Sequence, residues 1–258
     1  MKEGTVSINK KGGITTVAFQ GRGELNLLNH EVLSQLGLVM GRLREDSQTR
    51  VVIVKGQGKR AFSAGVDVKM MKEFTPRAME RFIRMMHATC THVMILPRPV
   101  IASVEGPCLG GSFELALACD MRIVADDAIF GLPEIKVGIP SVIEASLLAR
   151  IIGWGRATEL ILTGDTINAQ EAFRIGLVNR VVPKKDLNHE TLKMAQRLAL
   201  LSPYTMGVQK DVLRKWLELG HEQGAEYSIK ALALCFDTPD PREGMEAFLQ
   251  KRPANYPD

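Results

Sequence analysis

Short apolar segments that alternate with helical segments constrain the fold of this chain most strongly. Residues 51–54, 100–104 and 121–124 are short apolar runs of the kind that form buried strands. Residues 25–43 and 76–96 place apolar side chains at helical spacing. Strands that alternate with helices in this way are typical of parallel pairing. The pattern therefore predicts an α/β fold.

The two ends of the chain depart from this alternation. Residues 6–8 and 14–19 are rich in β-forming side chains and flank a Lys-Lys-Gly-Gly turn, which predicts a hairpin. After about residue 195 the strand patterns stop and helical patterns remain. We therefore divide the chain into a core over residues 1–195 and a helical region over residues 196–258. The helical region is expected to pack against a partner subunit, over an active site, or on its own core.

Composition and charge argue against several classes of protein. The 258 residues are 45% hydrophobic and 24% charged, which is typical of an ordered globular chain. Acidic and basic residues are interspersed and the net charge is +4, so we expect neither a nucleic-acid partner nor a membrane surface. No apolar stretch approaches the roughly 20 residues that span a bilayer, and no apolar signal region opens the chain. We therefore expect a soluble cytoplasmic protein.

The cysteines and histidines indicate no metal or redox site. Cys90, Cys108, Cys119 and Cys235 have no paired spacing and are expected to be buried thiols in a reducing compartment. The five histidines form no H-E-x-x-H motif, and a single histidine is more often a satisfied core or surface residue than a ligand. Phosphate-loop, dinucleotide and nucleophile-elbow patterns are also incomplete. We therefore predict no metal.

Two segments of small residues follow predicted strands. They are residues 61–67 and residues 106–114. Small residues allow backbone N–H groups to approach a ligand closely. In the second segment, Gly110 and Gly111 precede a predicted helix, and unpaired amides at a helix N-terminus favour negative charge.

Two glutamates accompany these segments. Glu114 lies in the first turn of the predicted helix, where a carboxylate also stabilises the helix dipole. Apolar neighbours indicate that it is partly buried, and Glu134 lies in similar surroundings twenty residues later. Both glutamates have a purely structural interpretation. Together with an oxyanion-binding turn, they are the components for acid/base chemistry beside a developing enolate.

The same segments resemble the crotonase superfamily, also called the enoyl-CoA hydratase/isomerase family. The matching segments are residues 60–69, 99–106, 109–120, 130–134, 162–165 and 176–183. They occur in the family's order, and the resemblance extends over most of the chain. It implies a spiral of ββα units with a C-terminal helical trimerisation region, assembled as a homotrimer or a dimer of trimers. It also implies an acyl-CoA thioester substrate with no separate cofactor.

The resemblance also implies roles for individual residues. The amides of Val66 and Gly111 would hold the thioester oxygen. The residues that would bind the substrate are Ala64, Val66, Asp67, Val68, Lys69, Gly110 and Gly111. Hydratases of the family carry glutamates at the positions of Glu114 and Glu134. The predicted reaction is reversible addition of water across the C2–C3 double bond of a 2-enoyl-CoA, with Glu134 giving a proton to C2 and Glu114 activating the water.

One segment departs from the family pattern. Hydratases usually have a glycine-rich stretch resembling P-G-A-G-G-T where this chain has residues 140–145, which include Ile143 and Glu144. We expect Glu144 either to be an acidic first-turn residue of a helix that continues to Ile151 or to alter the acyl pocket and its proton chemistry.

This departure leaves other functions open. Isomerisation, dehydration, decarboxylation and thioester hydrolysis of an acyl-CoA are alternatives within the family. A non-catalytic acyl-CoA-binding or RNA-binding scaffold is an alternative of another class. The small net charge and the few tyrosines and tryptophans argue against the RNA role.

Overall fold

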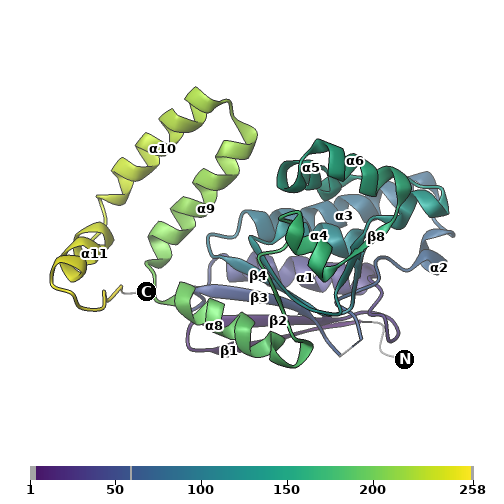
Figure 1. Cartoon of the computed structure of the whole chain (residues 1–258), viewed down its shortest axis with the longest axis horizontal. Helices are drawn as coiled ribbons and strands as arrows, with labels where there is room; N and C mark the ends of the chain where they lie inside the picture. The colour runs from purple at the N-terminus through teal and green to yellow at the C-terminus, as the bar shows by residue number, and fades with distance from the viewer. Residues whose placement is uncertain (1–3, 59, 257–258) are drawn as a thin grey trace.

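A six-stranded sheet, parallel except at one edge, forms the centre of the molecule (Figure 1). The computed structural model describes residues 4–58 and 60–256. In sheet order the strands are β1 (Thr5–Lys11), β2 (Ile14–Gln20), β3 (Val51–Gly56), β4 (Val100–Val104), β6 (Met121–Ala125) and β9 (Arg180–Val182). β1 is antiparallel to β2, and all other neighbours are parallel. The predicted hairpin and the α/β fold are therefore confirmed.

A second, three-stranded sheet lies beside the first. Its strands are β5 (Pro107–Leu109), β7 (Ile129–Gly131) and β8 (Thr166–Asn168). The sequence analysis described residues 106–114 as a small-residue segment leading into a helix and predicted no strand there, but residues 107–109 form β5, which pairs in parallel with β7. Cys108 also forms a bridge with Ser63. Because these partners are distant in sequence, local residue preferences did not reveal the strand.

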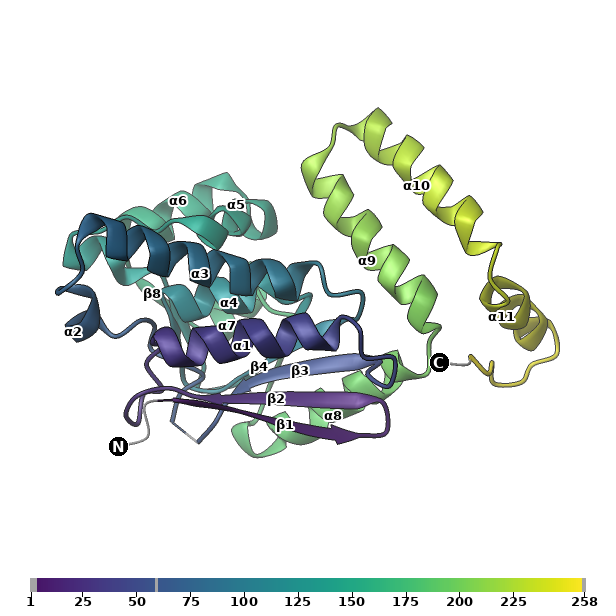
Figure 2. The same cartoon turned by 180° about the vertical axis from the view of Figure 1, so that it is seen from behind.

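Helices cover both faces of the large sheet (Figure 2). α1 (His30–Leu43), α3 (Pro76–Met94) and α4 (Gly111–Ala118) lie on one face, and α8 (Leu187–Ala199) lies on the other. Each face has its own buried apolar cluster, the smaller of which joins α8 to alternate side chains of the strands. α1 begins five residues later than predicted, because the Asn29 side chain accepts a hydrogen bond from the N–H of Val32 and caps the helix there.

Shorter elements complete the core. They are the helices α2 (Val68–Met71), α5 (Ser146–Ile152), α6 (Trp154–Thr163) and α7 (Ala169–Arg174), and the 3₁₀ turns η1 (Pro133–Val137), η2 (Ile143–Ala145) and η3 (Lys184–Asp186).

The last three helices extend away from the sheet as an arm (Figures 1 and 2). They are α9 (Pro203–Glu218), α10 (His221–Cys235) and α11 (Asp240–Leu249), and α10 packs mainly against α9. The arm leaves many large apolar side chains exposed, among them Trp216, Ile229, Leu232, Phe248 and Leu249. It begins after α8, whereas the division predicted at residue 195 falls within that helix. That division stays a prediction.

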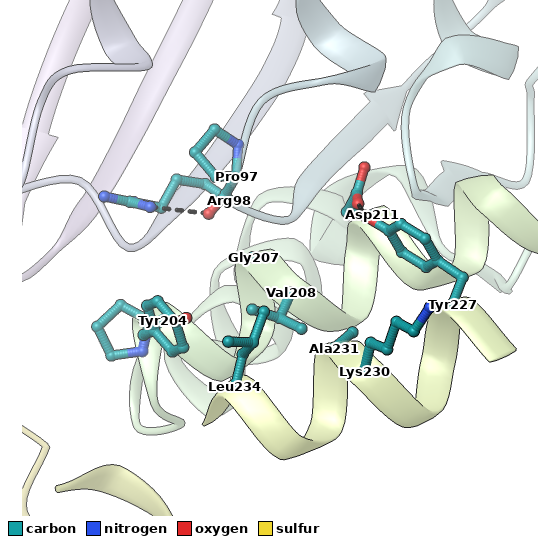
Figure 3. Close-up of a pocket in the computed structure, with 11 residues that line it drawn as sticks. Pro97, Arg98, Tyr204, Gly207, Val208, Asp211, Tyr227, Lys230, Ala231 and Leu234 are labelled. Carbon is teal, nitrogen blue, oxygen red and sulfur yellow. Dashed lines mark hydrogen bonds between the residues drawn. The ribbon is translucent and has the colours of Figure 1, made fainter. Parts of the chain in front are cut away.

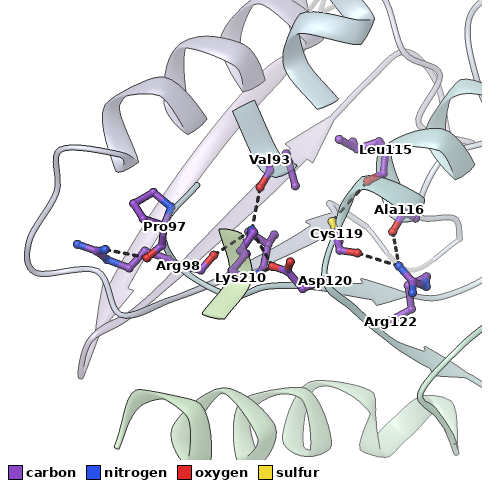
Figure 4. A network of polar contacts seen from close by, with 10 residues as sticks. Val93, Pro97, Arg98, Leu115, Ala116, Cys119, Asp120, Arg122 and Lys210 are labelled. Carbon is purple, nitrogen blue, oxygen red and sulfur yellow. Dashed lines mark hydrogen bonds and ion pairs between the residues drawn. The ribbon is translucent and has the colours of Figure 1, made fainter. Parts of the chain in front are cut away.

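Lys210 of α9 fixes the arm to the core (Figure 4). Its ammonium group donates to the carbonyl oxygens of Val93 (2.9 Å) and Arg98 (3.1 Å) and forms an ion pair with Asp120 (2.7 Å). Only 9% of the Lys210 side chain is exposed. These contacts join α9 to the end of α3 and to the loops that enter β4 and β6.

Arg122 of β6 holds the C-terminal end of α4 in the same network (Figure 4). Its guanidinium donates to the carbonyl oxygens of Ala116 (3.1 Å), Cys119 (2.8 Å) and Leu177 (2.7 Å). The last carbonyl groups of a helix have no partners within the helix, so a buried cation there both satisfies them and complements the dipole. α4 is thereby fixed at the end opposite to Gly111.

Lys210→Met is expected to destabilise the protein by roughly 2–3 kcal/mol. The substitution removes the cationic partner of the Asp120 carboxylate, which among the described residues keeps only the hydrogen bond from the N–H of Val100, and leaves two carbonyl groups without their charged donor. Urea unfolding at a fixed protein concentration measures the change. Lys193→Met, at an exposed position of α8, is the control and should change stability by less than about 0.5 kcal/mol. Equal effects of the two substitutions would show that Lys210 does not anchor the arm.

Candidate active site

A cavity of about 210 Å³ opens beside the N-terminus of α4. Its lining residues are Ala64, Gly65, Val66, Val68, Met71, Ile83, Met86, Gly110, Gly111, Glu114, Pro133, Glu134, Lys136, Val137, Ile139, Pro140, Ser141 and Val142. They come from the loop after β3, from α2 and α3, from the start of α4 and from the segment around η1. The cavity thus joins the two small-residue segments and the two glutamates that the sequence singled out.

Two backbone N–H groups at this cavity have no protein acceptor among the described residues. Val66 forms a parallel bridge with Leu28, in which the carbonyl of Gly65 and the N–H of Asp67 are used. The N–H of Val66 therefore points away from that bridge. Gly111 is the first residue of α4, so its N–H has no partner within the helix. These two groups are free to donate to a ligand oxygen.

Glycine is required where the two loops approach each other. Gly65 has φ +95°, and a Cβ there would lie 2.9 Å from the carbonyl oxygen of Leu109. Gly110 has φ +53°, and a Cβ there would lie 2.7 Å from Oε1 of Glu134. Both φ values belong to the region that side chains other than glycine disfavour. Gly65 thus allows its loop to approach the backbone at Leu109, and Gly110 allows the Glu134 carboxyl to approach the start of α4.

Glu114 is 4% exposed, and its Oε1 accepts a hydrogen bond from the N–H of Ala145 at 3.1 Å. Burial raises the pKa of Glu114 to about 8, and the negative charges of Glu134 and Glu144 act in the same direction. The Ala145 hydrogen bond opposes this shift. Glu114 therefore holds a proton at neutral pH.

Glu134 lies across the cavity at the start of η1 and is less buried. Its Oε2 accepts a hydrogen bond from the Ser141 hydroxyl at 2.9 Å. Burial raises the pKa of Glu134 above its usual value, while the hydrogen bonds it accepts, including that from Ser141, lower it. Two carboxyls that line one cavity, of which one is protonated, can give one proton and accept another.

Asp67 and Lys69 do not line this cavity. The Asp67 carboxylate accepts the N–H of Lys69 (2.9 Å), which caps α2, and also pairs with the guanidinium of Arg22 (3.0 Å). Asp67 therefore holds the loop that carries Val66. Binding of CoA by Asp67 and Lys69 stays a prediction, whereas Ala64, Val68 and Gly110 lie at the cavity.

Glu144 is an acidic first-turn residue, as one sequence interpretation expected, but its turn is the 3₁₀ turn η2 and its side chain is buried. It belongs to η2, before α5 begins at Ser146, and it is 3% exposed. Its Oε1 lies 2.6 Å from Nδ1 of His87 in α3. Sequence analysis missed His87, because the two residues are 57 positions apart and no spacing rule joins them.

Other candidate sites do not match this arrangement. Among residues 4–58 and 60–256, no group of three or more His, Cys, Asp or Glu side chains is placed to hold a metal, and no helix is long and apolar enough to cross a membrane. A cavity of about 420 Å³ lies between α9, α10 and the loop at Pro97 (Figure 3). Its carboxylate, Asp211, is already paired with Arg214 and Tyr227.

Comparison with known proteins decides the family. The family model described as Enoyl-CoA hydratase/isomerase matches residues 9–258. The chain belongs to this family. A short-chain-enoyl-CoA hydratase of Clostridium acetobutylicum is 33% identical over 253 residues, which are 98% of this chain and 97% of the relative. A crotonyl-CoA hydratase of Syntrophomonas wolfei is 36% identical over 233 residues, which are 90% of each chain.

Solved structures of the family confirm the fold. The crystal structure of an enoyl-CoA hydratase from Bacillus anthracis superposes with a TM-score of 0.93 at 33% identity, over 97% of this chain and 98% of that one. The crotonase-like α/β fold implied by the sequence resemblance is therefore confirmed, as is the expectation of an enzyme of the enoyl-CoA hydratase/isomerase family.

Glu114→Gln is expected to remove a pH-dependent loss of stability. A carboxyl whose pKa rises from 4.5 to about 8 on folding binds more protons in the folded state between these pH values. Stability therefore falls as pH rises through this window, by at most about 5 kcal/mol. The measurement is thermal or urea unfolding of both proteins at pH 5 and pH 9. Glu80→Gln, on the exposed face of α3, is the control; a Glu114→Gln profile parallel to it would contradict the assignment.

Proposed function

We propose that this protein adds water reversibly across the C2–C3 double bond of a 2-enoyl-CoA. The observation that carries the proposal is one small cavity in which two free N–H groups and two carboxyls with raised pKa values meet. The similarity to a short-chain-enoyl-CoA hydratase and to a crotonyl-CoA hydratase supports the same reaction.

In the proposed mechanism, the N–H groups of Val66 and Gly111 bind the thioester oxygen. Water adds at C3, and negative charge moves through the conjugated system onto that oxygen. Donors that are already oriented stabilise this charge at no cost of reorganisation, and the loss of one such donor typically lowers the rate by about 10²–10³. The position of Gly111 at the start of α4 adds the helix dipole to this effect.

The two glutamates move the protons in this proposal. One carboxylate accepts a proton from the attacking water, and the other carboxyl gives a proton to C2, so the pair carries one proton before and after the reaction. The sequence interpretation assigns the donation to Glu134 and the activation of water to Glu114. Greater burial favours the proton on Glu114 before the reaction. The atoms balance with either carboxyl as the donor, and the assignment of roles stays a prediction.

The size and lining of the cavity support a short apolar acyl group. Its volume of about 210 Å³ is below the roughly 300–1,000 Å³ of pockets for drug-sized ligands. Apolar side chains of Met71, Ile83, Met86, Val137 and Val142 form much of its wall. Because the thioester itself activates the alkene, the proposed reaction needs no cofactor besides the CoA of the substrate. Four buried free thiols support a reducing, cytoplasmic setting.

Isomerisation of the double bond is the second candidate. It needs one base that moves a proton between two carbons of the substrate, with no water. The presence of two carboxyls favours hydration, since each has a separate task there. Detection of the water added to the product distinguishes the two reactions.

The arm of α9, α10 and α11 supports a homotrimer or a dimer of trimers. Contiguous exposed apolar side chains on a soluble protein mark an interaction surface. On the arm these include Phe248, which is 82% exposed, and Leu249, which is 78% exposed. We therefore assign this surface to contacts with other copies of the chain.

Glu114→Gln and Glu134→Gln are each expected to lower the turnover of crotonyl-CoA by about 10² or more. Glutamine keeps the shape of the side chain but can neither take nor give the required proton. The loss of absorbance of the conjugated thioester, with mass detection of the hydrated product, measures the reaction. Glu80→Gln is the matched control. Near-normal hydration by either site variant would refute the two-glutamate mechanism, and conversion of the substrate without gain of water would favour isomerisation.

Sedimentation equilibrium is expected to give three or six times the chain mass of 28.5 kDa. Phe248→Asp should shift the distribution towards the monomer, because a charge on the arm would be buried on assembly. Ile8→Asp, at an exposed position of β1, is the control. A monomeric wild-type protein would refute the assignment of the arm.

A further inference from the structure

A third carboxyl, that of Glu144, lies behind Glu114. It does not line the cavity, and its side chain is 3% exposed. One oxygen lies 2.6 Å from Nδ1 of His87, while the other is buried and has no N–H or O–H donor among the described residues, so that the weakly donating thiol of Cys90 is the further contact of the carboxyl. A buried polar atom without a partner costs free energy. The carboxyl is therefore poorly explained by stability alone.

The turn that contains Glu144 holds Glu114 in place. The N–H of Ala145, the next residue, donates to Oε1 of Glu114 at 3.1 Å. The preceding residue, Ile143, has φ +42°, which a β-branched side chain rarely adopts. Such a turn persists only where surrounding contacts fix it. The hydrogen bond between His87 of α3 and Glu144 is a contact of this kind.

The charged and titratable groups around Glu144 are few. α3 contributes His87 and Cys90, α4 contributes Glu114, and α5 carries Arg150, which is exposed. Burial raises the pKa of Glu144 above its usual value, and the contact with His87 opposes this shift. Burial raises the pKa of Cys90 well above its usual range, so that thiol stays neutral. A negative charge on Glu144 in turn raises the pKa of Glu114.

We propose that His87 and Glu144 are positioning residues for Glu114. His87 fixes the turn whose Ala145 N–H binds Glu114, and the negative charge of Glu144 keeps the shared proton on the pair formed by Glu114 and Glu134. The side chain of His87 is 56% exposed, so it contacts both the solvent and the buried carboxyl of Glu144. The proposal rests on the hydration proposed above and assigns a task to the segment that departs from the family's glycine-rich pattern.

Glu144→Gln tests the role of the charge. Glutamine has the same size and can still bond to His87, so a packing role would leave the pH dependence of kcat/KM unchanged. Hydration requires the shared proton, so activity declines as pH rises through the pKa of Glu114. Without the Glu144 charge this decline is expected at a pH lower by roughly half a unit or more. KM for crotonyl-CoA at pH 7 should stay within about twofold, because Glu144 does not line the cavity.

His87→Ala and His87→Gln test the role of the turn. Alanine removes the contact with Glu144, and kcat is expected to fall roughly tenfold to a hundredfold through misplacement of Glu114. Glutamine can donate a hydrogen bond to Glu144 and should restore most of this loss. His92→Ala on α3 and Glu80→Gln on its exposed face are the matched controls and should behave as the wild type.

Several outcomes would overturn the proposal. They are a Glu144→Gln profile that coincides with the wild type, an equal shift in Glu80→Gln, and a fully active His87→Ala. If Glu144→Gln fails to fold, the His87 variants decide. Full activity of His87→Ala, or the same low activity in His87→Gln, contradicts the proposal.

If the wild type itself does not hydrate crotonyl-CoA, the proposed function fails separately. The pH dependence of unfolding then tests the effect of Glu144 on Glu114. Stability falls with rising pH up to the pKa of Glu114 near 8, and in Glu144→Gln this fall should end at a lower pH.

Discussion

The burial of Glu114 at the start of α4 is the constraint on which the rest of the site depends. A carboxyl with 4% exposure is costly to ionise, and this cost raises its pKa to about 8. Glu114 is held by α4, the helix that also begins with Gly111, so one short helix carries both the buried carboxyl and the N–H group proposed to bind the substrate. Arg122 fixes the other end of this short helix by binding its last carbonyl groups.

The site and the arm are connected through the same part of the core. Lys210 of α9 binds carbonyl groups at the end of α3 and pairs with Asp120, which follows α4. α3 in turn supplies Met86 to the cavity and His87 to Glu144. The arm therefore rests on the elements that shape the cavity, and assembly through the arm would keep these elements fixed relative to one another.

The segment from Pro140 to Ala145 shows how the chain departs from the glycine-rich pattern of family hydratases. Ile143 takes a positive φ where glycine would do so freely, and Glu144 turns inward to His87. The backbone still delivers an N–H to Glu114. The backbone of the turn thus contacts Glu114, while the side chain of Glu144 joins the turn to His87 of α3.

Local sequence determined the elements whose signal lies in neighbouring residues. The apolar runs of β3, β4 and β6, the helical spacing of α3 and the N-terminal hairpin were predicted because their periodicity is short-range. Glu114 could be singled out from its neighbours in the sequence, because an acidic residue among apolar residues is unusual. Only the tertiary structure decided the pairing of β5 with β7, the capping role of Asp67 and the contact between His87 and Glu144. The physical reason is that these interactions join residues through burial and hydrogen bonds across separate elements, which no local preference encodes.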